Sequence, residues 1–358
     1  MTTNQPLRLG LIGAGNIASV HIKTFTQLPD IRIESITDTY YPLAESRAEE
    51  FAIPKKPRTA QELLADPEVD AVIVCAPNQW HAPLAMEAMQ AGKHVILEKP
   101  MALDVASAKA IVRTQRDTGA TLMIPHQMRW EWVALQVKEQ MQQGALGRIY
   151  NAKAGWLRRK GIPGWGSWFT QKAMSGGGPL IDIGVHMLDL SLYLMGNPKP
   201  VSVYGSTYAE FGPKKRGIGS WGTPNWDGFY DVEDIAAALI KMEDGSILSL
   251  DVSWAAHLDT DSEPFVNLMG TEGGAAIRGS RGKLLHETAD GQLVDRELSP
   301  PDGDEGARLR MARHFVSCVR DGQAPLTDAI SGLTNNLILD AIYESSRTGR
   351  EVQLDWSL

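Results

Sequence analysis

Cysteine is nearly absent from this chain, because only Cys75 and Cys318 occur in 358 residues. They lie far apart in the sequence, so neither a disulfide framework nor a cysteine-based metal site is expected. Cys75 lies inside the apolar run 71–76 and is interpreted as a buried structural thiol. Concentrated positive charge is also lacking, since the formal net charge is -8. Nucleic-acid surfaces need clustered Lys and Arg, so no nucleic-acid partner is predicted.

Long apolar runs are missing as well. The longest, such as 69–77, are far shorter than the roughly 20 apolar residues that cross a bilayer. The stretch from Met1 to Pro6 is short and polar and lacks the pattern of a signal peptide. We therefore expect a soluble, cytoplasmic protein with no membrane partner. Hydrophobic residues make up 43% of the chain, enough to fill the cores of two domains at this length.

The first third of the chain alternates short apolar runs with helix-length segments. Strands that form apolar runs and alternate with helices indicate a parallel sheet covered on both faces. Asp104 is predicted to cap one helix, and Gly92 and Gly119 to end two others. The predicted strands are 7–12, 31–37, 69–76, 94–97 and 121–124, and the predicted helices are 16–27, 42–51, 81–91 and 104–117.

After about residue 145 the pattern changes to hairpins, with turn residues at 243–246 and around Asp290-Gly291. Hairpins pair strands antiparallel. We predict an α/β protein with a doubly wound Rossmann domain over 1–125, followed by an α+β domain with a large, mostly antiparallel open sheet over 126–358. Segment 211–231 is predicted to be a lid or binding loop. The further predicted strands are 149–156, 200–211, 236–242, 247–254, 284–288 and 293–298, and the final helices are 307–320 and 329–348.

The run from Gly13 to Ala18 follows the first predicted strand and opens the first helix, which matches the dinucleotide pattern G-x-G-x-x-A. Gly13 permits a tight turn, and Gly15 lets the backbone approach a pyrophosphate. Asn16 and Ile17 begin the helix, whose free N–H groups attract that anion. These residues are predicted to bind a nicotinamide dinucleotide.

Asp38 ends the second predicted strand, about 20 residues beyond the glycines. A carboxylate there accepts hydrogen bonds from the ribose hydroxyls and repels a 2′-phosphate, which favours NAD over NADP. Two alternatives stay open: Asp38 caps a turn or helix, or Arg47 reaches in to accommodate a phosphate.

Two further segments place reactive side chains. Lys99 ends a strand at the carboxyl edge of the predicted parallel sheet, where cofactors bind. Asp182 and His186 are four residues apart, so on a helix they share one face. Oxidation of a sugar hydroxyl needs a base, and a histidine with a pKa near neutrality is suited to that task.

With the glycine pattern, Glu98-Lys99-Pro100 and the run from Gly176 to His186 resemble the Gfo/Idh/MocA oxidoreductase family, over nearly the whole chain. The resemblance implies that Lys99, Asp182 and His186 form the catalytic group. His186 is then the general acid/base, Lys99 assists electrostatically and holds substrate, and the division of roles between Asp182 and His186 stays open. It also implies that Pro77, Asn78, His81, Glu98 and Lys99 line the cofactor.

Each of these assignments has a plainer alternative. Asp182 alone is a residue favoured in a first helical turn, and His186 alone is a core histidine. Asn78 is also a helix-cap candidate. Arg129 follows Gln127 where the family usually has Asn, so it is either a substrate ligand or part of a structural salt bridge. No metal is expected, although His126 or Asp189 could join Asp182 and His186 as ligands.

Tryptophan is abundant, with ten in the chain and eight between Trp130 and Trp254. Trp156, Trp165 and Trp168 flank a glycine-rich run just before the Asp182 helix, and indole faces pack well against sugar rings. We predict that these three contact substrate; sheet packing or a subunit interface is the alternative. Arg158, Arg159 and Lys160 leave an acidic sugar open.

The sequence therefore predicts an NAD-dependent oxidoreductase that moves a hydride between a sugar, cyclitol or sugar derivative and the nicotinamide. Two alternatives use the same fold: an NAD-dependent glycosidase with transient redox chemistry, and a non-catalytic regulator that senses sugar or NAD. A homodimer or homotetramer formed through the second domain's sheet is expected.

Overall fold

A computed structural model describes residues 5–259 and 261–358. The chain forms two compact units: one contains residues 1–127, 305–333 and 358, and the other contains 128–304 and 334–357. The predicted boundary after residue 125 assigned residues 305–333 to the second domain, whereas in the structure they belong to the first unit. No helix among the described residues is long and apolar enough to span a membrane.

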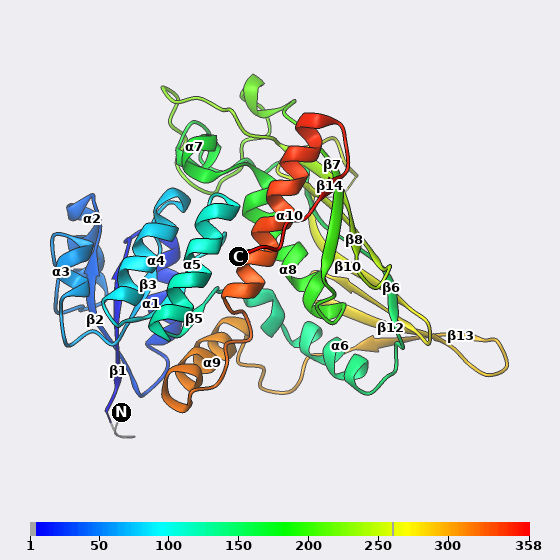
Figure 1. Ribbon diagram of the computed structural model, residues 1–358, viewed down its shortest axis with the longest axis horizontal. Helices are drawn as coiled ribbons and strands as arrows, with labels where there is room; N and C mark the ends of the chain where they lie inside the picture. Colours follow the sequence, from blue (N-terminus) through cyan, green and yellow to red (C-terminus); the bar gives the residue numbers. More distant parts are fainter. Residues whose placement is uncertain (1–4, 260) are drawn as a thin grey trace. The chain divides into compact units, whose positions relative to one another are not determined.

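The first unit is built on a five-stranded parallel sheet in the order β2-β1-β3-β4-β5. Figure 1 labels β2, β1, β3 and β5 of this sheet. Its strands are apolar runs buried on both faces, as parallel strands between helices must be. The strands are β1 (Leu7–Ile12), β2 (Ile31–Thr37), β3 (Ala71–Val74), β4 (His94–Leu97) and β5 (Leu122–Met123). The helices are α1 (Asn16–Phe25), α2 (Tyr41–Glu50), α3 (Ala60–Leu64), α4 (His81–Gln90), α5 (Val105–Thr118) and α9 (Ala307–Asp321).

Several local predictions for this unit are confirmed. Asp104 caps α5 by accepting a hydrogen bond from the Ser107 N–H at 2.7 Å, and Gly119 ends the helix in the left-handed conformation. The short helix α3 was not predicted. Helix α9 packs against α1, and Phe25 and Phe315 meet edge to face with ring centroids 6.4 Å apart.

The second unit contains a nine-stranded sheet in the order β13-β12-β11-β10-β6-β9-β8-β7-β14, in which β6 and β9 form the one parallel pair within the described strands. The predicted fold class is therefore confirmed. The strands are β6 (Ile149–Arg158), β7 (Pro200–Tyr208), β8 (Ile235–Met242), β9 (Ile247–Ser253), β10 (Ser262–Gly270), β11 (Gly274–Arg278), β12 (Arg281–Glu287), β13 (Leu293–Leu298) and β14 (Val352–Gln353).

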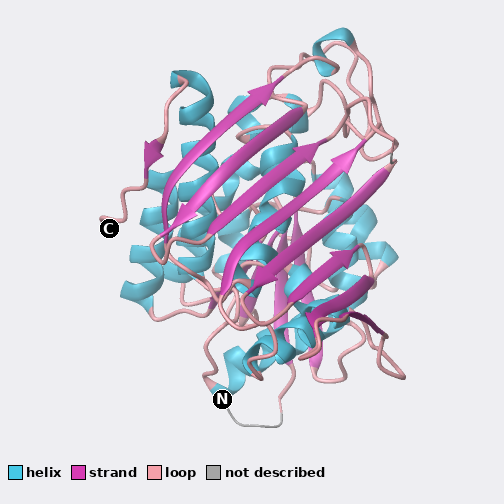
Figure 2. Cartoon of the chain, turned by 90° about the vertical axis from the view of Figure 1, so that its right-hand side faces the viewer, coloured by secondary structure: helices cyan, strands magenta, loops and turns pink. Residues whose placement is uncertain are grey.

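Helices cover one face of this sheet, and Figure 2 shows the opposite face with no helix in front of its strands. Helices α6 and α8 contact the strands directly. Burial alternates along β8 because its two faces meet different surroundings. The helices are α6 (Trp132–Gln142), α7 (Lys172–Ser175), the π-helix η4 (Leu180–Gly184), α8 (Val185–Leu194) and α10 (Ala329–Thr348), which begins within the first unit's residues.

Candidate functional site

The carboxyl edge of the five-stranded sheet gathers the residues predicted to bind the cofactor. Gly13 follows β1, Asp38 follows β2, Pro77 and Asn78 come soon after β3, and Glu98 and Lys99 follow β4. The strand order reverses between β1 and β3, and ligands of open α/β sheets bind at such a switch point.

The glycine loop has the geometry that a dinucleotide needs. Gly13 has a φ of +101°, and a Cβ there would lie 2.7 Å from the backbone of Cys75, so only glycine fits. A Cβ on Gly15 would meet nothing within 4 Å, which leaves the backbone open to a ligand. Gly15 is the N-cap of α1, and no side chain caps that helix. Exposed Asn16 and half-buried Ile17 therefore begin a helix whose N-terminus suits a pyrophosphate.

Asp38 lies beside this loop and is tied to it. One carboxylate oxygen accepts a hydrogen bond from the Ala14 N–H at 2.8 Å, and the other accepts one from the Tyr40 N–H at 2.8 Å. The Arg47 side chain donates to the Ala14 carbonyl oxygen at 3.2 Å and pairs with Glu50. The contacts named in both alternatives are thus present, since Asp38 turns the chain after β2 and the Arg47 side chain reaches the glycine loop, while ribose binding by Asp38 stays a prediction.

Glu98 joins β4 to α1 through a buried ion pair. Its Oε1 lies 2.7 Å from Nε2 of His21, and its Oε2 accepts a hydrogen bond from the Lys99 N–H at 3.2 Å. Burial raises the pKa of Glu98, but the hydrogen bond and charge of His21, with the charges of Lys99 and His81, lower it to about 2. The carboxylate is therefore ionised and fixes the backbone of half-buried Lys99, whose peptide bond to Pro100 is cis.

The side chains after β3 are mostly engaged by the protein. Nδ1 of His81 lies 2.7 Å from the Pro100 carbonyl oxygen, and Nε2 lies 2.9 Å from that of Ala76, so this buried ring links two strand ends. Asn78 begins a short 3-10 helix, and the cap position of α4 is occupied by Trp80 instead. Cys75 is confirmed as a buried thiol; burial and the charge of Glu98 raise its pKa well above the ordinary value.

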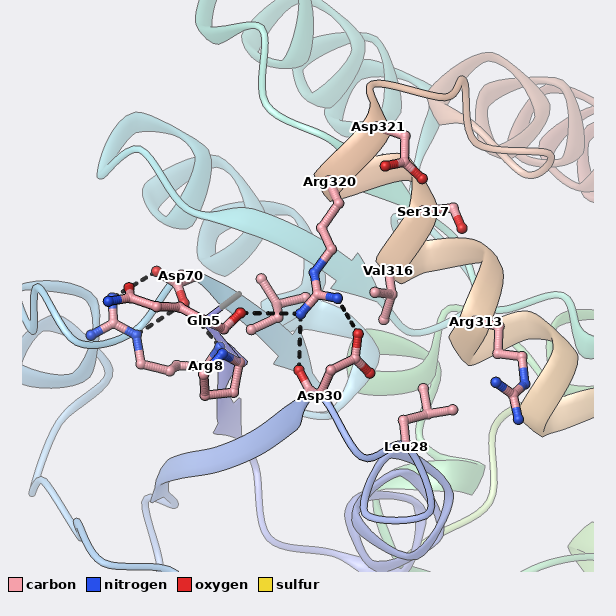
Figure 3. Close-up of a pocket in the computed structure, with 12 residues that line it drawn as sticks. Gln5, Arg8, Leu28, Asp30, Asp70, Arg313, Val316, Ser317, Arg320 and Asp321 are labelled. Atoms are coloured by element: carbon pink, nitrogen blue, oxygen red, sulfur yellow. Dashed lines mark hydrogen bonds and ion pairs between the residues drawn. The ribbon is translucent and has the colours of Figure 1, made fainter. Parts of the chain in front are cut away.

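A cavity of about 630 Å³ lies at the opposite, amino edge of this sheet (Figure 3). Four of its charged side chains form two ion pairs: Arg8 binds Asp70 at 2.8 Å, and Arg320 binds Asp30. Cofactors of this fold bind at the carboxyl edge, so the cavity is not the dinucleotide site.

In the second unit, η4 and α8 form one continuous helical stretch that carries Asp182 and His186. Every residue from Gly177 to Met195 is buried except Asp182, which is half-buried. His186 is 7% exposed. Segments of π-helix are rare and are often found at functional sites. The stretch therefore presents one carboxylate to solvent, with an imidazole one turn further along.

A buried carboxylate caps this stretch. The Glu233 oxygens accept hydrogen bonds from the N–H groups of Gly178 at 3.0 Å and Leu180 at 3.1 Å, and from the Tyr343 hydroxyl at 3.0 Å. Burial raises the pKa of Glu233, and these donors oppose that shift. A Cβ on Gly178 would lie 2.1 Å from the Glu233 carbonyl oxygen, which explains why the chain has glycine there.

Asp182 contacts a tryptophan that the sequence did not single out. The Trp254 indole N–H donates a hydrogen bond to Oδ2 of Asp182 at 3.0 Å. Burial lowers the pKa of Arg158 on β6, and the charge of nearby Asp182 partly opposes this shift.

The predicted substrate tryptophans are engaged within the second unit. Trp165 is 4% exposed, donates to the Gly212 carbonyl oxygen at 2.8 Å and stacks on Trp226. Half-buried Trp156 donates to the Ser262 hydroxyl at 3.1 Å, and half-buried Trp168 stacks on Phe169. This arrangement favours packing for Trp165, whereas substrate contact by Trp156 and Trp168 stays a prediction.

Arg129 is 3% exposed and forms a two-pronged salt bridge with Asp189, with both N–O distances 2.7 Å. The geometry favours the structural alternative over a substrate ligand. Within residues 5–259 and 261–358, no group of three His, Cys, Asp or Glu side chains is placed to hold a metal.

Segment 211–231 is bonded along its length to residues 161–172. The carbonyl oxygen of Gly217 accepts from Gly161 and Ile162, that of Trp221 from Gly164, and that of Trp165 from Asn225. Asp231 then accepts from the Lys172 N–H at 2.6 Å. The predicted binding loop is therefore paired with residues 161–172, which precede the helical stretch with Asp182.

Known families match both parts of the chain. Residues 7–126 match the "Oxidoreductase family, NAD-binding Rossmann fold", and residues 134–276 match the "GFO/IDH/MocA C-terminal domain". The chain is therefore an NAD-dependent oxidoreductase of the two-domain class. It belongs to the Gfo/Idh/MocA family, as the resemblance predicted.

Individual relatives agree over the full length. The chain is 33% identical to D-glucoside 3-dehydrogenase of Escherichia coli (strain K12), with 98% of this chain and 99% of that protein covered. It is 26% identical to scyllo-inositol 2-dehydrogenase (NAD(+)) of Bacillus subtilis, with 98% and 96% covered. The fold matches the structure of a levoglucosan dehydrogenase in complex with NADH and L-sorbose, with a TM-score of 0.88, 24% identity, and 98% and 99% covered.

The buried Glu98–His21 pair predicts a pH dependence of stability. The pKa of Glu98 is depressed in the folded state, so its contribution is present above the ordinary value of 4.5 and is lost as the pH falls toward 2. Glu98→Gln should lower the free energy of unfolding at neutral pH by about 1–3 kcal/mol. Below pH 4.5, wild-type stability should fall more steeply than that of the variant.

Urea denaturation without cofactor, followed by circular dichroism at several pH values, measures both effects. Glu49→Gln changes an exposed carboxylate on α2 and serves as the control. Equal pH dependence in wild type and Glu98→Gln would contradict the assignment.

Proposed function

We propose that this protein is a cytoplasmic dehydrogenase that oxidises a secondary hydroxyl of a sugar, cyclitol or glycoside and transfers the hydride to NAD⁺. The observation that carries the proposal is the helical stretch of the second unit, where Asp182 alone reaches solvent and His186 lies one turn away. A carboxylate and an imidazole together suit recognition and deprotonation of a hydroxyl. The named relatives, which are dehydrogenases of a glucoside and an inositol, support the substrate class.

The chain's own residues divide the work as follows. His186 accepts the hydroxyl proton of the substrate, and Asp182 accepts a hydrogen bond that orients the hydroxyl or the imidazole. Lys99 supplies positive charge, which disfavours imidazolium and stabilises the developing alkoxide. A bound nicotinamide would supply the acceptor for the hydride of the carbon. The loop from Gly13 to Ile17 would hold its pyrophosphate, and Asp38 the adenosine ribose.

Lys99→Met tests this mechanism. It should lower kcat by about 10²- to 10⁴-fold, because a charge that acts mainly in the transition state is lost, while NADH binding changes little. A panel of sugars, cyclitols and glycosides, each with NAD⁺, is followed by NADH absorbance, and binding is measured by NADH fluorescence. Lys214→Met, at an exposed lysine after β7, is the matched control. Turnover of Lys99→Met at the wild-type rate would refute the mechanism.

The same panel separates net oxidation from transient redox chemistry. A dehydrogenase accumulates NADH in proportion to oxidised substrate. A glycosidase that oxidises, eliminates and re-reduces releases the aglycone with no net NADH.

Cofactor choice is assigned to Asp38. NADPH should bind roughly 100-fold more weakly than NADH, because the negative charge of Asp38 repels the 2′-phosphate of NADPH, and such like-charge contacts cost several kcal/mol. Asp38→Asn should narrow this ratio, since it keeps an acceptor for Ala14 and removes the charge. Asp104→Asn, at the carboxylate that caps α5, should leave the ratio unchanged. Fluorescence titration with both cofactors measures the two affinities. If the wild type binds NADPH as tightly as NADH, or more tightly, Asp38 does not select the cofactor.

We also propose that copies of the chain assemble through the uncovered face of the large sheet. Tyr204 on β7 pairs in register with Leu239 on β8, and the two side chains are 51% and 49% exposed. Exposed apolar side chains on an open sheet are typical of a subunit interface.

Sedimentation velocity should find a dimer or tetramer that Leu239→Lys dissociates. Leu293→Lys, at an 84% exposed leucine on β13, is the control and should not dissociate it. A monomeric wild type would exclude the assembly.

A further inference from the structure

Trp254 lies directly after β9 and is the largest fully buried side chain of the described residues. Its backbone N–H donates to the Asp234 carbonyl oxygen at 2.9 Å. Its ring belongs to a buried cluster that includes Ile183, from the same π-helix as Asp182. The remaining members of this cluster are Ile162, Trp165, Val232 and Ala255, with Trp156, Phe211, Ile218 and Tyr230 packed against it.

The one polar atom of this ring is directed at Asp182. The indole Nε1–H donates to Oδ2 of Asp182 at 3.0 Å. Asp182 is half-buried, and a carboxylate partly in solvent can rotate about its side-chain bonds. A ring held on all sides by packing cannot follow such a rotation, so the hydrogen bond selects one orientation of the carboxylate.

We propose that Trp254 is a positioning residue that fixes the Asp182 carboxylate for reaction with the substrate hydroxyl. This inference rests on the proposed function, in which Asp182 orients the hydroxyl or the imidazole. With Oδ2 engaged by the indole, Oδ1 has a fixed direction and serves as the acceptor toward the reacting groups.

The chemistry of indole makes this control one-sided. The indole N–H is a donor and never an acceptor, so it binds the ionised carboxylate more strongly than a protonated one, which keeps only a weaker acceptor oxygen. Trp254 therefore keeps Asp182 as a hydrogen-bond acceptor. Arg158 acts on the same carboxylate by its charge.

Trp254→Phe removes the N–H and keeps an aromatic ring. The chain offers a matched control, because Trp165 is buried in the same cluster and donates to a backbone carbonyl oxygen instead. We expect Trp254→Phe to lower kcat by about 10- to 100-fold relative to Trp165→Phe, because the reacting groups lose alignment. The two variants should match in thermal stability and NADH affinity. The acid limb of the kcat/KM pH profile, which reports the base His186, should move to higher pH in Trp254→Phe only, because Asp182 without the indole donor attracts the imidazolium more strongly.

A second measurement needs no turnover. The indole ¹H–¹⁵N resonances of the ten tryptophans are recorded without substrate, and Trp254 and Trp165 are assigned from the two variants. Asp182→Ala should shift the Trp254 indole proton upfield and leave that of Trp165 in place.

The outcomes distinguish a failure of the proposed function from a failure of the positioning role of Trp254. If wild type oxidises no member of the panel, the proposed function fails, and the indole shift still reports whether Trp254 binds Asp182. If wild type is active and Trp254→Phe equals Trp165→Phe in kcat and pH profile, the positioning role is overturned. If Asp182→Ala leaves the Trp254 indole proton at its wild-type chemical shift, the positioning role is also overturned.

Discussion

The buried carboxylate of Glu233 is the contact on which the arrangement of the second unit's candidate residues depends. It accepts from two N–H groups at the start of the stretch that carries Asp182, and from Tyr343 on α10. The adjacent Asp234 accepts from the N–H of Gly212 at 3.0 Å, so neighbouring acids hold the helical stretch and the beginning of segment 211–231. The helix start, the paired loop and the sheet are thereby held in one geometry, and Trp254 then orients the carboxylate that reaches solvent.

The first unit uses a comparable device at the end of β4. A buried ion pair is stable only when the remaining hydrogen-bonding capacity of each charge is also satisfied. Glu98 meets this condition with His21 on one oxygen and the Lys99 N–H on the other. The backbone that carries Lys99 is thus fixed to the helix that the glycine loop begins. In each unit a buried carboxylate positions a residue that the sequence singled out.

The sequence predicted the elements whose signals are local. Strands β1, β2 and β4 have the predicted bounds because turn residues flank apolar runs. Helix α6 and strands β10 and β11 were not predicted. For the two strands, Pro264 and the glycines at 273–274 weaken the strand pattern. The glycine loop, Asp38 and Lys99 were found because their positions after strands are visible in sequence. Trp254 lies 72 residues from Asp182 and Glu233 lies 55 from Gly178, and no local pattern reports such contacts.

Helix α9 is synthesised after strands β6 to β13 of the large sheet, yet it belongs to the first unit. The first unit takes residues 305–333 from near the end of the chain, and Phe315 of α9 packs on Phe25 of α1. During translation the dinucleotide-binding half therefore emerges first but completes its core last, after nearly all of the second unit has been made. Domains generally fold as units from the N-terminus. In this chain the apolar face of α1 is covered only after residues 305–333 have been made, so folding of the N-terminal unit is coupled to synthesis of the second unit.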